Sequence, residues 1–121
     1  MHERHPEWPI HVTRRDVDDA LVLRVVGKID LFTAPQLHDA IAASLDHTSG
    51  GAIIVDLGGV TFLGSVGLAA LAGAARDAAE HDRPLRIVLD GNNLVILPIE
   101  LTGLDAVLEL YPTVEAALNA G

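Results

Sequence analysis

The first two apolar stretches of the chain have the patterns of β-strands. Between Ile10 and Arg15, apolar and polar residues alternate with the period of a strand that is buried on one face. Residues 20–26 form a nearly continuous apolar run, which is typical of a central strand covered on both faces. Three of the four residues between these stretches, Asp16 to Asp19, are aspartates. The pattern therefore predicts a strand, a turn and a second strand.

The first helix is predicted from signals at its start. Thr33 is expected to cap the helix, with Gln36 three residues later completing a capping box. Phe32 before the cap and Leu37 after it have the spacing of a hydrophobic staple. The helix is expected to end at residues 48–51, Thr-Ser-Gly-Gly.

The central stretch joins an apolar strand to a helix that begins without charged residues. Residues 52–57 are mostly apolar and rich in β-branched residues, which predicts a short, buried, parallel strand. Gly58 and Gly59 are expected to form a turn, and the next helix is expected to begin at Ser65, whose hydroxyl is an N-cap candidate. Helical spacing predicts a buried stripe of Leu68, Leu71, Ala72, Ala75 and Ala79. The opposite face of this helix is expected to be uncovered and to consist of small, uncharged residues: Val66, Ala69, Ala70, Gly73 and Ala74.

The rest of the chain continues the alternation of strands and helices. We expect a strand at 85–89, a helix at 93–101 that Pro98 kinks or delays, an edge strand at 107–110 and a helix at 114–119 that Thr113 caps. The resulting order predicts an α/β fold with a mixed, mainly parallel β-sheet and four helices. Residues 1–9 are expected to form a flexible N-terminal leader, and residues 10–121 a single domain.

Composition and charge exclude several classes of partner and of chemistry. The 121 residues carry a formal charge of −9, which argues against nucleic acid and anionic membranes as partners, since both require basic patches. There are no cysteines, so disulfides and thiolate chemistry are excluded. The first residues lack the apolar core of a signal peptide, and a cytoplasmic location is expected.

Enzymatic motifs in the central stretch are incomplete. The segment Gly59 to Ser65 is spaced like a phosphate-binding loop but lacks its lysine, and the elbow of serine hydrolases needs glycine where Leu63 stands. The six histidines have no spacing typical of a metal site. We therefore expect no catalytic activity, no metal and no cofactor. Asp30 and Asp56 are each expected at the C-terminal end of a strand, where either ligand binding or turn formation explains them.

Several segments together resemble the STAS domain of bacterial anti-sigma factor antagonists. The matching segments, in chain order, are Val26–Asp30 with Thr33-Ala34, Ile54–Leu57, Val60–Leu68, Glu100–Asp105 and Tyr111–Leu118. The resemblance covers roughly residues 10–120 and implies the STAS fold. It implies that the protein binds an anti-sigma factor, often a serine kinase, and so frees a sigma factor. In that family the kinase inactivates the antagonist by phosphorylating a serine at the start of the second helix, and a serine phosphatase reverses this phosphorylation.

The resemblance also implies the site. Ser65 stands at the position of the phosphoacceptor, with Gly64 where the family usually has aspartate and Val66 where it has a second hydroxyl. The partner-binding residues are expected to be Asp30, Thr33, Gly64, Ser65, Val66, Gly67, Ala69, Ala70 and Gly73. A plain N-cap role for Ser65 is the alternative. A STAS sensor or scaffold that works without phosphorylation is the alternative function, and we expect a monomer or weak dimer.

Overall fold

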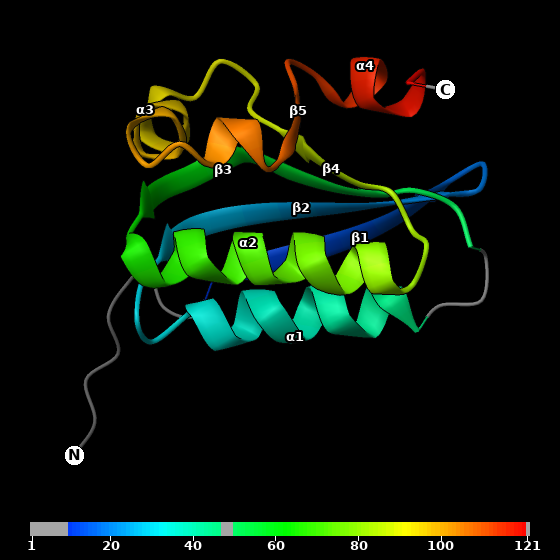
Figure 1. The fold of residues 1–121 in the computed structure, drawn as a ribbon, viewed down its shortest axis with the longest axis horizontal. Helices are drawn as coiled ribbons and strands as arrows, with labels where there is room; N and C mark the ends of the chain where they lie inside the picture. The colour runs from blue at the N-terminus through cyan, green and yellow to red at the C-terminus, as the bar shows by residue number, and fades with distance from the viewer. Residues whose placement is uncertain (1–9, 47–49, 121) are drawn as a thin grey trace.

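A computed structural model describes residues 10–46 and 50–120, which contain a five-stranded sheet (Figure 1). The strands lie in sequence order: β1 (His11–Val17), β2 (Ala20–Ile29), β3 (Ile53–Leu63), β4 (Leu85–Val88) and β5 (Glu109–Tyr111). β1 pairs antiparallel with β2, and the other neighbouring strands pair in parallel. The predicted mixed, mainly parallel sheet is therefore confirmed. The predicted leader, residues 1–9, lies outside the described residues.

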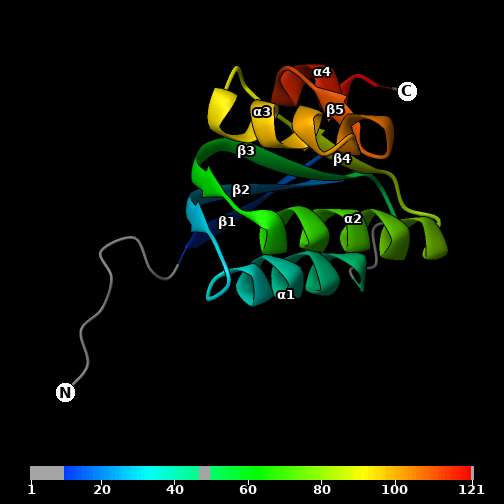
Figure 2. The same ribbon diagram turned by 60° about the vertical axis from the view of Figure 1, so that its left-hand side comes forward.

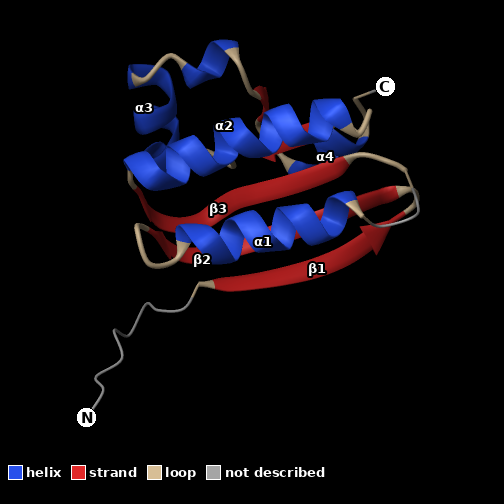
Figure 3. Cartoon of the chain, turned by 60° about the horizontal axis from the view of Figure 1, so that its bottom comes forward, coloured by secondary structure: helices blue, strands red, loops and turns tan. Residues whose placement is uncertain are grey.

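The helices occupy both faces of this sheet. They are α1 (Ala34–Leu45), α2 (Ser65–Glu80), α3 (Asn93–Leu101) and α4 (Val114–Leu118), so the predicted four helices are confirmed. A short 3₁₀ turn, η1 (Leu104–Ala106), follows α3. α1 and α2 lie side by side on one face, as Figures 2 and 3 show, and α4 lies on the opposite face. Within the described residues, no helix is both long and apolar enough to cross a bilayer.

Alternation along β2 and β3 divides the core into two parts. Over residues 21–25 of β2 and 53–57 of β3, odd-numbered residues belong to the core part that contains α1 and α2, and even-numbered residues such as Val22 and Ile54 face α4. The larger part is closed by Leu37 and Ile41 of α1 and by Leu71 of α2, all at most 1% exposed. The near-continuous apolar runs of the sequence follow from burial on both faces.

β3 is longer than the sequence predicts, because Gly58 and Gly59 belong to the strand and form no turn. Pairing with β2 continues past both glycines to Leu63, with shifts in register. A Cβ atom at Gly58 would lie 2.7 Å from Asp90 Oδ2, and one at Gly59 would lie 2.8 Å from Val26 Cγ2. The glycines therefore allow the segments that contain Val26 and Asp90 to approach β3 closely.

The predicted capping box and staple of α1 are wrong. Thr33 does occupy the N-cap position, but its side chain makes no cap hydrogen bond, because it donates instead to the Lys28 carbonyl at 2.6 Å. Gln36 Nε2 donates to the Ile10 carbonyl at 2.7 Å, so it does not complete the box. Phe32 is 72% exposed and forms no staple. Of the predicted helix end, residues 47–49 lie outside the described residues.

The buried face of α2 is rotated relative to the prediction. The residues buried against the sheet and α1 are Gly67, Leu68, Leu71, Ala74 and Ala78. Ala79, predicted to be buried, is exposed, and Ala74, predicted to be bare, is buried. α3 begins at Asn93 as predicted and accommodates Pro98, and Thr113 caps α4 by accepting a hydrogen bond from the N–H of Ala116 at 3.0 Å.

Candidate functional site

The C-terminal ends of β2 and β3 lie side by side and bring the predicted site residues together. Ile29 pairs with Leu63, and the N–H of Gly64 donates to the Ile29 carbonyl at 3.1 Å. β2 then continues into the loop 30–33 before α1, and β3 leads directly into α2 (Figure 2). The loop and the start of α2 therefore share one end of the sheet.

Ser65 is the first residue of α2, and its side chain is exposed. Gly64 occupies the N-cap in an extended conformation and supplies no side-chain cap, so the predicted N-cap role of Ser65 is wrong. Within the described residues, the Ser65 hydroxyl makes no hydrogen bond to another group of the protein. The N–H groups of the first helical turn have no intrahelical acceptor, so this end of α2 carries a partial positive charge.

Asp30 and Thr33 shape the loop between β2 and α1. Asp30 Oδ1 accepts hydrogen bonds from the N–H of Phe32 at 2.9 Å and of Thr33 at 3.1 Å. Thr33 Oγ1 accepts one from the N–H of Asp30 at 2.9 Å. Thr33 is buried and Asp30 half-buried, so both act on the surface through the loop that they fix.

Large apolar side chains are exposed at the end of the sheet where Ser65 lies. Leu31 and Phe32, from the loop, are 66% and 72% exposed, and Phe62 and Val66, on either side of Gly64 and Ser65, are 47% and 40% exposed. We call this region the Ser65 surface: Leu31, Phe32, Phe62, Ser65, Val66 and Ala69. Lys28 Nζ lies 5.8 Å from the centre of the Phe62 ring and adds a cation at its border.

The remaining predicted partner-binding residues fall into two groups. Ala69 is exposed, and Ala70 and Gly73 are half-buried on the open side of α2. Gly67 is buried, because a Cβ atom there would lie 2.6 Å from Ile29 Cγ2 and 2.8 Å from Leu63 Cδ1. Gly67 therefore allows α2 to pack closely on the strand ends.

Sequence reasoning missed Leu31, Phe32 and Phe62 as site residues. The available signal was their position: Leu31 and Phe32 stand between a strand and a helix, outside the period of either element. The prediction that Asp56 lies at the end of a strand is wrong, because β3 continues for seven residues beyond it, to Leu63. Among the described residues, no three His, Asp or Glu side chains are grouped closely enough to hold a metal ion.

Comparison with known proteins identifies the family. The STAS domain family model matches residues 11–117. The anti-sigma-F factor antagonist RsfB of Mycobacterium tuberculosis is 37% identical over 111 residues, which cover 91% of this chain and 88% of that protein. The anti-sigma-B factor antagonist of Listeria monocytogenes is 30% identical over 110 residues, covering 91% and 93% of the two chains.

A solved structure agrees with these relatives. The crystal structure of an anti-sigma factor antagonist from Mycobacterium paratuberculosis matches with a TM-score of 0.82 and 36% identity, covering 96% of both chains. The resemblance predicted from the sequence is thereby confirmed. The chain belongs to the STAS domain family, and within it to the bacterial anti-sigma factor antagonists.

Proposed function

We propose that this protein binds an anti-sigma factor through the Ser65 surface and so releases a sigma factor. The observation that carries the proposal is a free, exposed hydroxyl at the same end of the sheet as four exposed, large apolar side chains. The names of the relatives support the identity of the partner. The protein acts in the cytoplasm by binding, without catalysis, as a monomer or weak dimer.

Apolar and aromatic side chains supply the affinity for the partner. Aromatic residues, phenylalanine included, are enriched at the buried core of protein interfaces. Phe32 and Phe62 fit that role, because a partner can bury much of each ring. Asp30, Thr33 and Gly67 position these groups from below the surface, and Ala70 and Gly73 border it.

Ser65 is the regulatory phosphoacceptor in this proposal, and the anti-sigma factor or another protein is the serine kinase. Phosphate would add about −1.5 to −2 charges beside N–H groups that favour anions. Burying that charge among apolar side chains is strongly unfavourable, so phosphorylation releases the partner by desolvation and repulsion. A serine phosphatase restores binding.

Titration of the cognate anti-sigma factor by calorimetry tests this proposal. Ser65→Ala should bind like the wild type, whereas Ser65→Glu should bind at least about tenfold more weakly, which corresponds to about 1.4 kcal/mol. The matched control is Ala79→Glu, which puts the same charge on an exposed position near the other end of α2. Equal affinity of the Ser65→Glu and Ala79→Glu variants would contradict the role of the Ser65 surface.

A STAS sensor or scaffold without phosphorylation is the second candidate. Gly64 and Val66 favour it, since they replace the acidic residue and the second hydroxyl of the acceptor motif that the resemblance implies. Mass spectrometry after incubation with an active anti-sigma kinase and ATP separates the two. One added phosphate that Ser65→Ala abolishes supports the first candidate, and an unchanged mass supports the second.

A further inference from the structure

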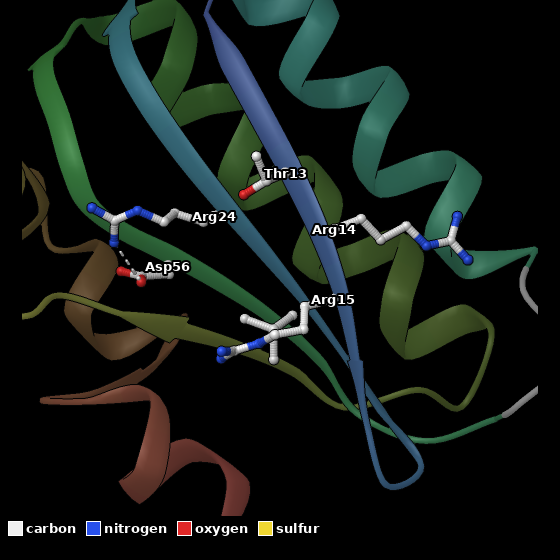
Figure 4. A pocket seen from close by; sticks show the side chains of 6 residues that line it. Thr13, Arg14, Arg15, Arg24 and Asp56 are labelled. Carbon is white, nitrogen blue, oxygen red and sulfur yellow. Dashed lines mark hydrogen bonds and ion pairs between the residues drawn. The ribbon is translucent and has the colours of Figure 1, made fainter.

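A groove of about 450 Å³ lies on the sheet face opposite α1 and α2 (Figure 4). Its lining residues come from three adjacent strands: Thr13, Arg14, Arg15, Val22, Arg24 and Asp56. Pairing of β1 with β2 sets Thr13 opposite Arg24 and Arg15 opposite Val22, and pairing of β2 with β3 sets Arg24 beside Asp56. The volume lies in the range of small-molecule sites.

The side chains of Arg15 and Arg24 extend over the same face of the sheet. In Figure 4 both reach toward β3, whereas Arg14 extends to the other side of β1. The opposite directions of Arg14 and Arg15 follow from the alternation of side chains along a strand. Two guanidinium groups therefore flank one groove, whereas the guanidinium group of Arg14 lies on the other side of β1, although Arg14 also lines the groove.

The hydrogen bonds of the groove leave donors unused. Arg24 Nη1 contacts Asp56 Oδ2 at 3.1 Å, and the other Asp56 oxygen accepts the N–H of Gly58 at 2.9 Å. The Arg24 side chain is nevertheless 50% exposed, and among the described residues Asp56 is its one side-chain partner. Among the described residues, Arg15 has no hydrogen-bond or ion-pair partner.

The groove is basic although the protein as a whole is acidic. On this face of the sheet it has two arginines and one carboxylate, against a formal charge of −9 for the chain. A guanidinium group offers a planar set of donors that matches the oxygens of carboxylates and phosphates. Between the arginines, the floor holds apolar Val22 and the hydroxyl of Thr13.

We propose that this groove binds a small organic anion, either a carboxylate or a phosphate ester. Its oxygens contact the guanidinium groups of Arg15 and Arg24, the Thr13 hydroxyl donates a further hydrogen bond, and its carbon portion packs on Val22. The site lies on the face of the sheet opposite α2, and it stands independently of the function proposed for the Ser65 surface.

Titration followed by ¹⁵N NMR at constant ionic strength tests the site, with inorganic phosphate, phenyl phosphate and benzoate as probes. We expect saturable shifts of the amides of Thr13, Val22 and Arg24. Phenyl phosphate should bind more tightly than inorganic phosphate because its ring adds apolar contact. Comparison of phenyl phosphate with benzoate identifies which anion the groove prefers.

The two adjacent arginines of β1 provide matched variants, since both are exposed and both substitutions remove one charge. Arg15→Gln should weaken binding at least about tenfold, and Arg14→Gln should leave it nearly unchanged. Asp56→Asn should raise the affinity, because it removes the carboxylate that repels the anion. Thermal unfolding verifies that each variant folds.

Three results would overturn the proposal. Shifts that fail to saturate with every probe would show only general screening of charge. Equal weakening by Arg14→Gln and Arg15→Gln would show a dependence on net charge, as expected if the arginines merely protect the edge strand from association. Unchanged or lower affinity of the Asp56→Asn variant would contradict the electrostatic basis of the site.

Discussion

Two glycines of α2, Gly67 and Gly73, should respond in opposite ways to alanine. Glycine in a helix interior is about 1 kcal/mol less favourable than alanine, so an unobstructed Gly→Ala change stabilises. Position 73 is unobstructed, since the nearest atom to a new Cβ would be Arg76 Nη2 at 3.7 Å. Gly73→Ala should therefore raise the free energy of unfolding by about 0.5–1 kcal/mol.

At position 67 the same methyl group has no space. It would lie 2.6 Å from Ile29 Cγ2 and 2.8 Å from Leu63 Cδ1, and these side chains are 0% and 4% exposed. Overpacking of this kind destabilises by about 1–3 kcal/mol, which exceeds the gain in helix propensity. We expect Gly67→Ala to lower the free energy of unfolding by about 1 kcal/mol and to move the start of α2, with Ser65, away from the strand ends.

Urea unfolding measures both effects, because a change in the midpoint at constant slope reports stability. The two variants should differ by about 2 kcal/mol, and only Gly67→Ala should also weaken binding of the anti-sigma factor. Equal stabilisation by both substitutions would refute the close packing of α2 on β2 and β3. Destabilisation by Gly67→Ala with wild-type binding would refute the link between this packing and the Ser65 surface.

Three further substitutions test the supports and the contacts of the site. Asn92→Ala should lower the free energy of unfolding by about 2–3 kcal/mol in urea unfolding, since the side chain caps α3 and also donates to carbonyls of β3 at 2.7 and 3.0 Å. Thr33→Val should speed amide hydrogen exchange in the loop 30–33 and destabilise by about 1–2 kcal/mol, whereas Thr33→Ser, which keeps the hydroxyl, should behave like the wild type. Phe32→Ala should weaken anti-sigma factor binding by at least about tenfold in calorimetry, with little change in stability because the ring is already exposed. Its control is Leu101→Ala, an exposed apolar residue of α3 outside the Ser65 surface, and equal loss in both would contradict the assignment.

The order of strands and helices could be predicted because periodicity and caps are local signals. The apolar run at 20–26 and the cap at Thr113 are examples, and both are found in the structure. The extension of β3 could not be predicted. A Gly-Gly pair is compatible both with a turn and with a strand that neighbouring segments approach closely, so the pair alone does not distinguish them. The atoms that distinguish the two cases belong to Val26 and Asp90, far from the pair in sequence.

The candidate site could be located from the sequence, but its chemical character could not. Ser65 was identifiable by its place between a strand and a helix. The spacing of Phe32 and Leu37 predicts a hydrophobic staple, in which Phe32 would be buried. The structure exposes it, since hydrogen bonds between Asp30 and Thr33 close the loop beneath it. Such contacts depend on the path of the whole loop, which no pattern in the sequence specifies.

Gly64 explains why the hydroxyl of Ser65 is free and why its surroundings are apolar. A glycine N-cap is only a few tenths of a kcal/mol less favourable than a hydroxyl or carboxyl cap, so α2 starts stably without using Ser65. A Cβ atom at position 64 would lie 2.9 Å from Phe62 Cε2, so glycine also gives the aromatic ring room to lie over the turn. An aspartate there would displace the ring and place a charge beside the hydroxyl. With glycine, the exposed large side chains that flank Ser65 in the sequence are Phe62 and Val66, and a phosphate on Ser65 would change an uncharged binding surface into a strongly anionic one.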